Sequence, residues 1–261
     1  MSNQEPAYFN FGLSSDEDQT KRNYFSMFPE EIVASVLDAF IINKPMTGRA
    51  GGDGFWVHQD ETSLFVAVFD CMGHGHLASM MTRVYTQSLD KLVKTDNEKD
   101  PGTILRYLHH MIESRFKEKT NLKVGPAADV GIVKIDMGIR KIEFSGAGMN
   151  LIQIEGGELK EIKGHKLQVG DRFEYMHDYR TNLLSLNSRL LSNIYLMSDG
   201  LKDLMHGGTE KRLSSKGVIE ILLKIYGESM LKQKEMLIAE IDNWKGSMPL
   251  TDDILILGFA I

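Results

Sequence analysis

The chain has 261 residues, of which 42% are hydrophobic and 25% are charged, and its formal net charge is −6. This is the composition of a globular protein with one large domain or two small ones, and no basic block offsets the acidic balance, which argues against general nucleic-acid binding. The longest apolar stretches, such as residues 64–69, are far too short to cross a bilayer, which excludes a membrane-spanning protein.

Two further features predict a cytoplasmic protein. The first ten residues contain no basic segment followed by an apolar one, so no secretory signal is visible. The single cysteine, Cys71, excludes an internal disulfide framework and is typical of a reducing compartment.

The N-terminal part is expected to form an arm followed by a helix. Residues 1–28 are polar with scattered aromatic residues, so we interpret them as a loosely packed arm that precedes a single domain over 29–261. Pro29 opens a segment over 30–42 in which apolar residues recur at helical spacing behind an acidic first turn. This pattern predicts a helix, and the turn-rich residues 47–54 end it.

A hairpin and two helices are predicted next. Residues 55–70 contain two apolar segments, and the second is a continuous apolar run, which is typical of a strand buried on both faces. Helical periodicity then extends over 76–93 and over 102–117.

The rest of the chain predicts a series of strands, a pair of helices and a last strand. Short strands with glycine turns are expected over 127–136, 141–148, 150–163 and 172–176, and a further strand over 193–197. Helices are expected over 215–228 and 230–244, before a buried strand at 253–261. Because strands and helices are grouped in separate blocks, the order favours an α+β layered domain over a doubly wound parallel sheet.

Four acids lie at the ends of predicted core strands or in tight turns: Asp53, Asp70, Asp199 and Asp252. A carboxylate in such a place is held rigidly and can still face a cleft. Hard cations such as Mg²⁺ and Mn²⁺ take oxygen ligands, and two such ions can activate a water for an in-line phosphoryl displacement. Aspartate beside glycine is also ordinary turn chemistry, so a structural role for each acid is the alternative, and spacing alone does not bring the four together.

Four motifs carry a family resemblance: GGDG (51–54), FDCMGHGHLASMM (69–81), MSDGLKDL (197–204) and TDDILIL (251–257). In order and separation they resemble the metal-dependent PP2C-like serine/threonine phosphatases, and most closely the bacterial SpoIIE/RsbU branch. The resemblance spans residues 30–261. It implies a four-layer α-β-β-α sandwich of mainly antiparallel sheets with a site for two Mn²⁺ or Mg²⁺ ions at one edge, which agrees with the α+β order of elements.

Carried over by position, the resemblance also implies a ligand set. Asp53 and Asp70 would bridge or flank the two ions, the backbone carbonyl of Cys71 would be a further ligand, and Asp199 and Asp252 would complete the set. Asp253 would tune the site or cap the last strand. A water activated by the ions, and no covalent nucleophile, would attack the phosphorus.

The chain departs from the family pattern at three positions. Gly54 stands where many relatives have an aromatic residue, Cys71 stands where a small or β-branched residue is common, and Leu255 replaces a threonine. None of these departures removes a metal-binding carboxylate, so they concern the surface that faces the substrate.

Several neighbouring residues have open roles. Arg49 could bind the substrate phosphate, because a guanidinium group matches phosphate oxygens, or it could be a solvated loop residue. His74 could be a general acid, could support a metal ligand or could serve the turn, and Asp129 could serve a third metal position. A nucleophilic Cys71 is not expected, because Leu77 stands where a phosphate-binding arginine would follow.

The resemblance implies a phosphatase that acts on phosphoserine or phosphothreonine in a small regulatory protein, typically a STAS-type anti-sigma-factor antagonist in bacterial partner switching. The helix predicted over 30–42 stands where relatives carry a regulatory or dimer-forming element, so a homodimer is one reading and a simple packing layer is the other. Two further functions stay open: a non-catalytic pseudophosphatase that binds a partner, which the presence of all four acids disfavours, and a hydrolase of small phosphate esters.

Overall fold

The structure, a computed structural model, describes residues 33, 37–48, 50–73, 75–116, 126–171, 178–187 and 189–261. Four predictions of the sequence analysis lie outside these residues: the arm over 1–28, the strand over 172–176, and the roles of Arg49 and His74.

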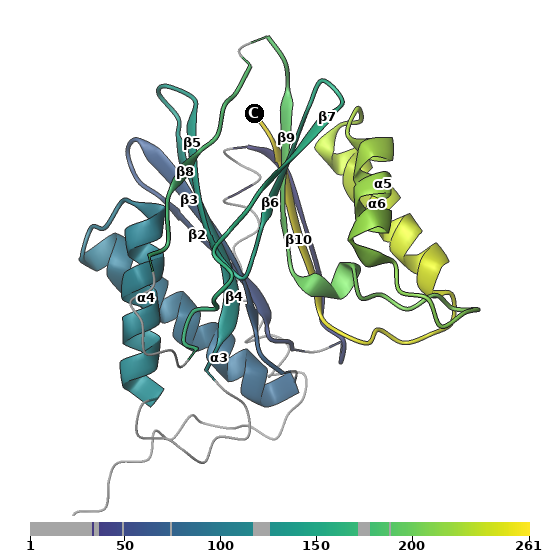
Figure 1. The fold of residues 1–261 in the computed structure, drawn as a ribbon, viewed down its shortest axis with the longest axis horizontal. Coiled ribbons are helices and arrows are strands. Elements are labelled where there is room, and N and C mark those ends of the chain that lie inside the picture. Colours follow the sequence, from purple (N-terminus) through teal and green to yellow (C-terminus); the bar gives the residue numbers. More distant parts are fainter. Residues whose placement is uncertain are drawn as a thin grey trace, which may run out of the picture.

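Two five-stranded antiparallel sheets form the centre of the fold (Figure 1). The first, here called the β3 sheet, has the order β2 (Asp53–Gln59), β3 (Ser63–Cys71), β4 (Ala128–Asp136), β5 (Lys141–Ala147) and β8 (Asn182–Leu183). The second, here called the β9 sheet, has the order β1 (Asp38–Lys44), β10 (Ile254–Ala260), β9 (Ser192–Met197), β6 (Leu151–Glu155) and β7 (Glu158–Ile162).

Helices cover the outer face of each sheet (Figure 1). The β3 sheet is covered by α3 (Gly75–Leu89), which continues as a π-helix over Asp90–Thr95, and by α4 (Pro101–Phe116). The β9 sheet is covered by α5 (Ser214–Ile225) and α6 (Met230–Lys245). This arrangement confirms the predicted α-β-β-α sandwich, and within the described parts of the chain no helix is both long and apolar enough to span a bilayer.

The alternation of side chains along β3 explains how one strand serves two layers. Val66 and Val68 point into the core between the sheets, whereas Phe65, Ala67 and Phe69 pack against the helices α3 and α4. Successive residues of a strand face opposite sides, so a strand in the middle of four layers must be apolar throughout. The continuous apolar run of β3 is therefore buried on both faces, as predicted.

The helix predicted over 30–42 is wrong for residues 38–42. The chain from Asp38 is instead the edge strand β1, which pairs antiparallel with β10 in a register from Asp38 opposite Ala260 to Lys44 opposite Ile254. Phe40 and Ile42 pack under α5 and α6, while Ile41 enters the core between the sheets. A short run of apolar residues fits either period, and pairing with β10 together with burial on both faces selects the strand.

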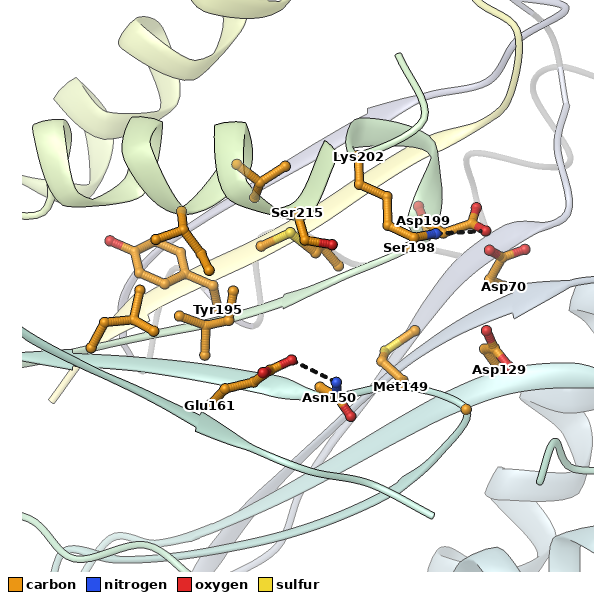
Figure 2. Close-up of a pocket in the computed structure, with 16 residues that line it drawn as sticks. Asp70, Asp129, Met149, Asn150, Glu161, Tyr195, Ser198, Asp199, Lys202 and Ser215 are labelled. Carbon is orange, nitrogen blue, oxygen red and sulfur yellow. Dashed lines mark hydrogen bonds and ion pairs between the residues drawn. The ribbon is translucent and has the colours of Figure 1, made fainter. Parts of the chain in front are cut away.

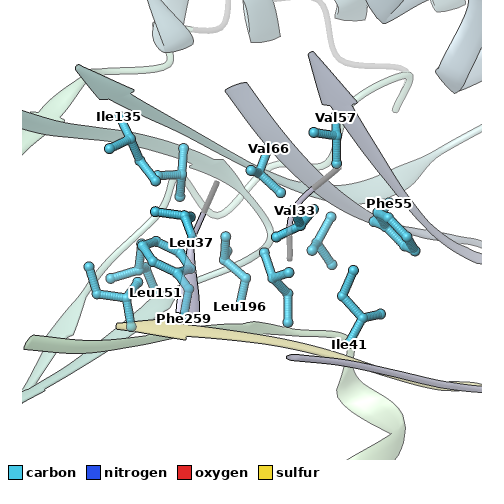
Figure 3. Close-up of a cluster of buried hydrophobic side chains, with 14 of the residues drawn as sticks. Val33, Leu37, Ile41, Phe55, Val57, Val66, Ile135, Leu151, Leu196 and Phe259 are labelled. Carbon is cyan, nitrogen blue, oxygen red and sulfur yellow. The ribbon is translucent and has the colours of Figure 1, made fainter. Parts of the chain in front are cut away.

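The core between the sheets fixes the distance and orientation of the two layers that carry the acidic motifs. Figure 3 shows Phe55 and Val57 of β2 approaching Ile41 of β1 and Leu196 of β9. Because protein interiors are close-packed, displacement of either sheet would open a cavity in this core.

We expect Phe55→Ala to lower the free energy of unfolding by about 3–5 kcal/mol, since Phe55 is fully buried in this core and its loss leaves a cavity. Chemical denaturation in the presence of EDTA measures the change. The matched control is Leu183→Ala, because Leu183 is 65% exposed and its loss should cost no more than about 0.5 kcal/mol. A loss below about 1 kcal/mol for Phe55→Ala, the average for any substitution, would contradict the packing described here.

Candidate metal centre

Three strands of the β3 sheet place a carboxylate at the same edge. Asp53 begins β2, Asp70 lies near the end of β3, and Asp129 lies near the start of β4. In the strand register Asp53 is opposite Asp70, and Asp70 is opposite Asp129. Directly opposed residues of antiparallel strands have Cβ atoms about 4.5–5.5 Å apart on the same face. The three carboxylates therefore form a row.

The β9 sheet brings its own acids to this row from the other side. Asp199 follows β9, and Asp252 and Asp253 precede β10. The backbone N–H of Asp199 donates a hydrogen bond to the Asp70 carboxylate. Figure 2 shows the side chains of Asp199 and Asp70 close together, with Asp129 beside Asp70. The turns of two different sheets thus meet at one acidic cluster.

Both carboxylate oxygens of Asp253 accept hydrogen bonds from backbone N–H groups. Its side chain is buried, Oδ1 accepts a hydrogen bond from the backbone N–H of Met46 at 2.7 Å, and Oδ2 accepts one from Gly52 at 2.6 Å. A Cβ atom at Gly51 would lie only 2.4 Å from Oδ2 of Asp253. Asp253 therefore holds the turn before β2 against the start of β10, and the glycine allows that close approach.

Ser198 connects the two sheets at the cluster, and the sequence analysis did not single it out. Its hydroxyl donates to Oδ2 of Asp53 at 2.5 Å and accepts from the backbone N–H of Leu255 at 3.0 Å. A hydroxyl residue directly before a strand-end aspartate was the available sequence signal, but its partner Asp53 lies 145 positions away. The bond orients the buried carboxylate of Asp53, which is the acid of the first motif, GGDG (51–54).

Cys71 lies at the end of β3, and its side chain belongs to the hydrophobic core between the β3 sheet and the helices α3 and α4. Burial, reinforced by the charges of Asp70 and Asp53, raises the pKa of its thiol well above the ordinary range. A thiolate is therefore not formed, which argues against a nucleophilic role. The backbone of Cys71 instead faces the GGD turn: its N–H donates to the carbonyl of Gly52 at 3.2 Å, and a Cβ atom at Gly52 would lie 2.4 Å from the Cys71 carbonyl oxygen.

The pKa values of four of the clustered acids are raised. Burial raises the pKa of Asp70 to about 7, and the charges of Asp199, Asp129 and Asp252 reinforce the shift. Burial also raises the pKa of Asp53, with the charge of Asp70 as the next cause. The pKa of Asp129 and that of Asp252 are raised by burial as well. Burial and the neighbouring negative charges disfavour the ionised form of these carboxylates, and a bound cation would stabilise that form.

The donor set fits a hard divalent cation. The groups that the described residues bring together are carboxylate oxygens, with the backbone carbonyl of Cys71 next to Asp70. Oxygen atoms of these kinds are the ligands that Mg²⁺ and Mn²⁺ prefer. Lys202 is the one cationic side chain among the described residues lining the adjoining cavity, and its Nζ lies 3.0 Å from Oδ2 of Asp199 and 3.2 Å from Oδ2 of Asp203. The described residues lining this cavity therefore offer one positive charge beside the carboxylates.

Asp129 is oriented by its own neighbours. Nε2 of Gln168 donates to Oδ1 of Asp129 at 2.8 Å. Gly148, whose φ is +72°, passes so close that a Cβ atom there would lie 1.7 Å from the same oxygen. Asp129 faces a cavity of about 190 Å³, which Asp70 and Asp199 also line (Figure 2).

Comparison with known proteins gives two kinds of match. The family model described as Stage II sporulation protein E (SpoIIE) matches residues 60–261. Among solved structures, the SiaA-PP2C domain of Pseudomonas aeruginosa is 26% identical and has a TM-score of 0.84, with 94% of this chain and 95% of that chain covered. No match is found among curated protein sequences.

Two more distant structures share the fold. The PP2C phosphatase domain of SpoIIE from Bacillus subtilis is 16% identical, with a TM-score of 0.67 over 85% of this chain and 62% of that one. RsbX, solved in complex with magnesium, is 19% identical, with a TM-score of 0.57 over 85% of this chain and 94% of that one.

The metal-free protein is expected to lose stability as the pH rises toward 7. The pKa of Asp70 is raised from an ordinary value of 3.8 to about 7, so between these values the folded protein holds a proton that the unfolded chain has released. Stability then falls with rising pH. Asp70→Asn removes this ionisation, so the variant should be more stable than wild type at pH 8 in EDTA, and the difference should shrink at pH 5. Urea denaturation at both pH values measures it, and a difference independent of pH would contradict the argument.

Ser198→Ala is expected to weaken Mn²⁺ binding by about 10–100-fold, the usual cost of losing a group that orients a metal ligand. Isothermal titration calorimetry measures the affinity directly, without relying on catalysis. Ser198→Thr is the matched control, because it keeps the hydroxyl that donates to Asp53. Equal affinity in the alanine variant, or a threonine variant that binds as weakly as alanine, would contradict an orienting role.

Proposed function

The chain belongs to the SpoIIE family of PP2C-type serine/threonine protein phosphatases, and on that premise we propose that it uses two divalent cations to dephosphorylate a small regulatory protein. The observation that carries the proposal is the meeting of carboxylates from both sheets at the end of one cavity. Such an arrangement gives a phosphoryl group in the cavity access to a cation held by the carboxylates.

We propose Asp53, Asp70, Asp199, Asp252 and the backbone carbonyl of Cys71 as the metal ligands. Their position at the shared edge of the sheets supports this set. The magnesium in the RsbX structure supports a hard cation, either Mg²⁺ or Mn²⁺. The chemistry supplied by such ions is polarisation of the phosphoryl group and a lowered pKa for a water nucleophile.

The other residues of the site would act through position and charge. Ser198 would keep the Asp53 carboxylate oriented across the two sheets, and Asp253 would hold the turn that presents Asp53. Lys202 lies where its ammonium group can donate to a phosphate oxygen at the edge of the cluster. Asp129 is an additional oxygen donor beside Asp70. Arg49 as a phosphate ligand and His74 as a general acid remain predictions from the sequence.

The proposed partner is a phosphorylated STAS-type regulatory protein in a partner-switching system. This proposal rests on the resemblance of the four motifs to the SpoIIE/RsbU branch and on membership of the SpoIIE family. A homodimer and a cytoplasmic location also remain predictions.

The test compares Asp70→Ala and Asp199→Ala with wild type in the hydrolysis of para-nitrophenyl phosphate and of phosphocasein. Both variants should lose at least about 100-fold in kcat/KM with Mn²⁺, more than the loss of an orienting partner costs, because each removes a metal ligand. EDTA should abolish activity in the wild type.

The matched control is Asp96→Ala, an exposed aspartate in an ion pair with Lys91 at the end of the π-helix. It should retain wild-type activity. Undiminished activity in both site variants would overturn the proposal, and so would full activity in EDTA. Hydrolysis of the aryl phosphate without any hydrolysis of phosphoproteins would favour a hydrolase of small phosphate esters.

A further inference from the structure

The cavity beside the acidic cluster has a chemically different far end. The labelled residues in Figure 2 run from Asp70 and Asp129 at one end, past Met149 and Ser215, to Tyr195 and Glu161 at the other. The apolar side chains that line the same cavity are Ile152, Leu159, Met197, Val218 and Ile219. The cavity is thus continuous from the carboxylates to an apolar wall.

This wall comes from incomplete coverage of the β9 sheet. Ile152 on β6 lies on the outer face of the sheet, and so does Leu159 on the edge strand β7. Helix α5 approaches them with Val218 and Ile219, which share a helix face with Ser215 in the first turn. Ile152, Leu159 and Ile219 are only half-buried although they are aliphatic, so their remaining surface faces the cavity.

The volume of the cavity limits what can occupy it. At about 190 Å³ it is smaller than the ~300–1,000 Å³ typical of sites that enclose a whole small molecule. It has the size for one side chain of a larger ligand. Polar groups also line it: Nδ2 of Asn150 donates to Oε1 of Glu161 at 2.7 Å, and Lys202 lies near the carboxylates. A lining of apolar side chains with a few polar groups is typical of a pocket that receives an apolar group.

We infer that this apolar wall binds an aliphatic side chain of the protein substrate, close in sequence to the phosphorylated residue. The inference rests on the proposed function, which places the phosphate at the carboxylates. A substrate segment held there must cross the adjoining surface, and the continuous cavity is the part of that surface built to receive an apolar residue. Sequence preference around the phosphorylation site would then be set by Leu159 and Ile219.

The test measures kcat/KM for short phosphoserine peptides in which leucine or aspartate is placed in turn at each position flanking the phosphoserine. Wild type with Mn²⁺ should prefer leucine over aspartate at one position by about 10-fold or more, the order of discrimination that a hydrophobic pocket supplies. In Ile219→Arg and Leu159→Arg this ratio should fall toward one, because a charged side chain then occupies the wall.

The two variants lie on different elements, so a folding defect in one does not decide the result, and thermal unfolding checks both. Leu231→Arg on α6 is the matched control, since Leu231 is 68% exposed and lies outside the cavity, and it should keep the wild-type ratio. A leucine preference that survives in both cavity variants would overturn the inference. Hydrolysis of para-nitrophenyl phosphate and phosphocasein without any leucine preference would overturn it alone, whereas no hydrolysis of any substrate would overturn the proposed function as well.

Discussion

Repulsion among the carboxylates at the shared edge of the two sheets is the constraint on which the site depends. Asp53, Asp70 and Asp129 stand side by side in one sheet, and Asp199 meets them from the other. Without opposing contacts, this charge would push the sheets apart at that edge. Among the described residues three hydrogen-bonded connections oppose it. Ser198 joins the sheets through Asp53, the backbone N–H of Asp199 donates to Asp70, and Asp253 anchors the turn before β2 to the start of β10.

The apolar layers complete the restraint, because the packing between the sheets is close and cannot adjust to a shifted edge without opening voids. The β3 sheet is held from both sides, by the core behind Val66 and by the helices against Phe65. The protein therefore keeps charged groups close together at a cost that its buried core offsets. Enzymes commonly tolerate such locally unfavourable electrostatics at the place where a ligand will neutralise it.

Much of this could be predicted from the sequence, and the exceptions have physical reasons. The apolar run of β3 and the glycine-flanked aspartates are local patterns, so the layers and the positions of the acids followed from them. The sequence of β1 predicts a helix because its short apolar run fits both periods, and only the pairing with β10 selects the strand. The bonds from Ser198 to Asp53 and from Gly52 to Asp253 join residues 145 and 201 positions apart, and the cavity depends on how far α5 covers β7. None of these contacts can be recognised from a short stretch of the sequence.

The burial of Cys71 has a consequence for the chemical environment in which the enzyme can work. Its thiol is 1% exposed and kept protonated, and it is the only cysteine in the chain. Oxidants and alkylating reagents that attack cysteine act on accessible thiolates, so they have no cysteine target in this chain. Oxidation of a cysteine, the reaction that silences cysteine-dependent phosphatases, is therefore closed to this protein.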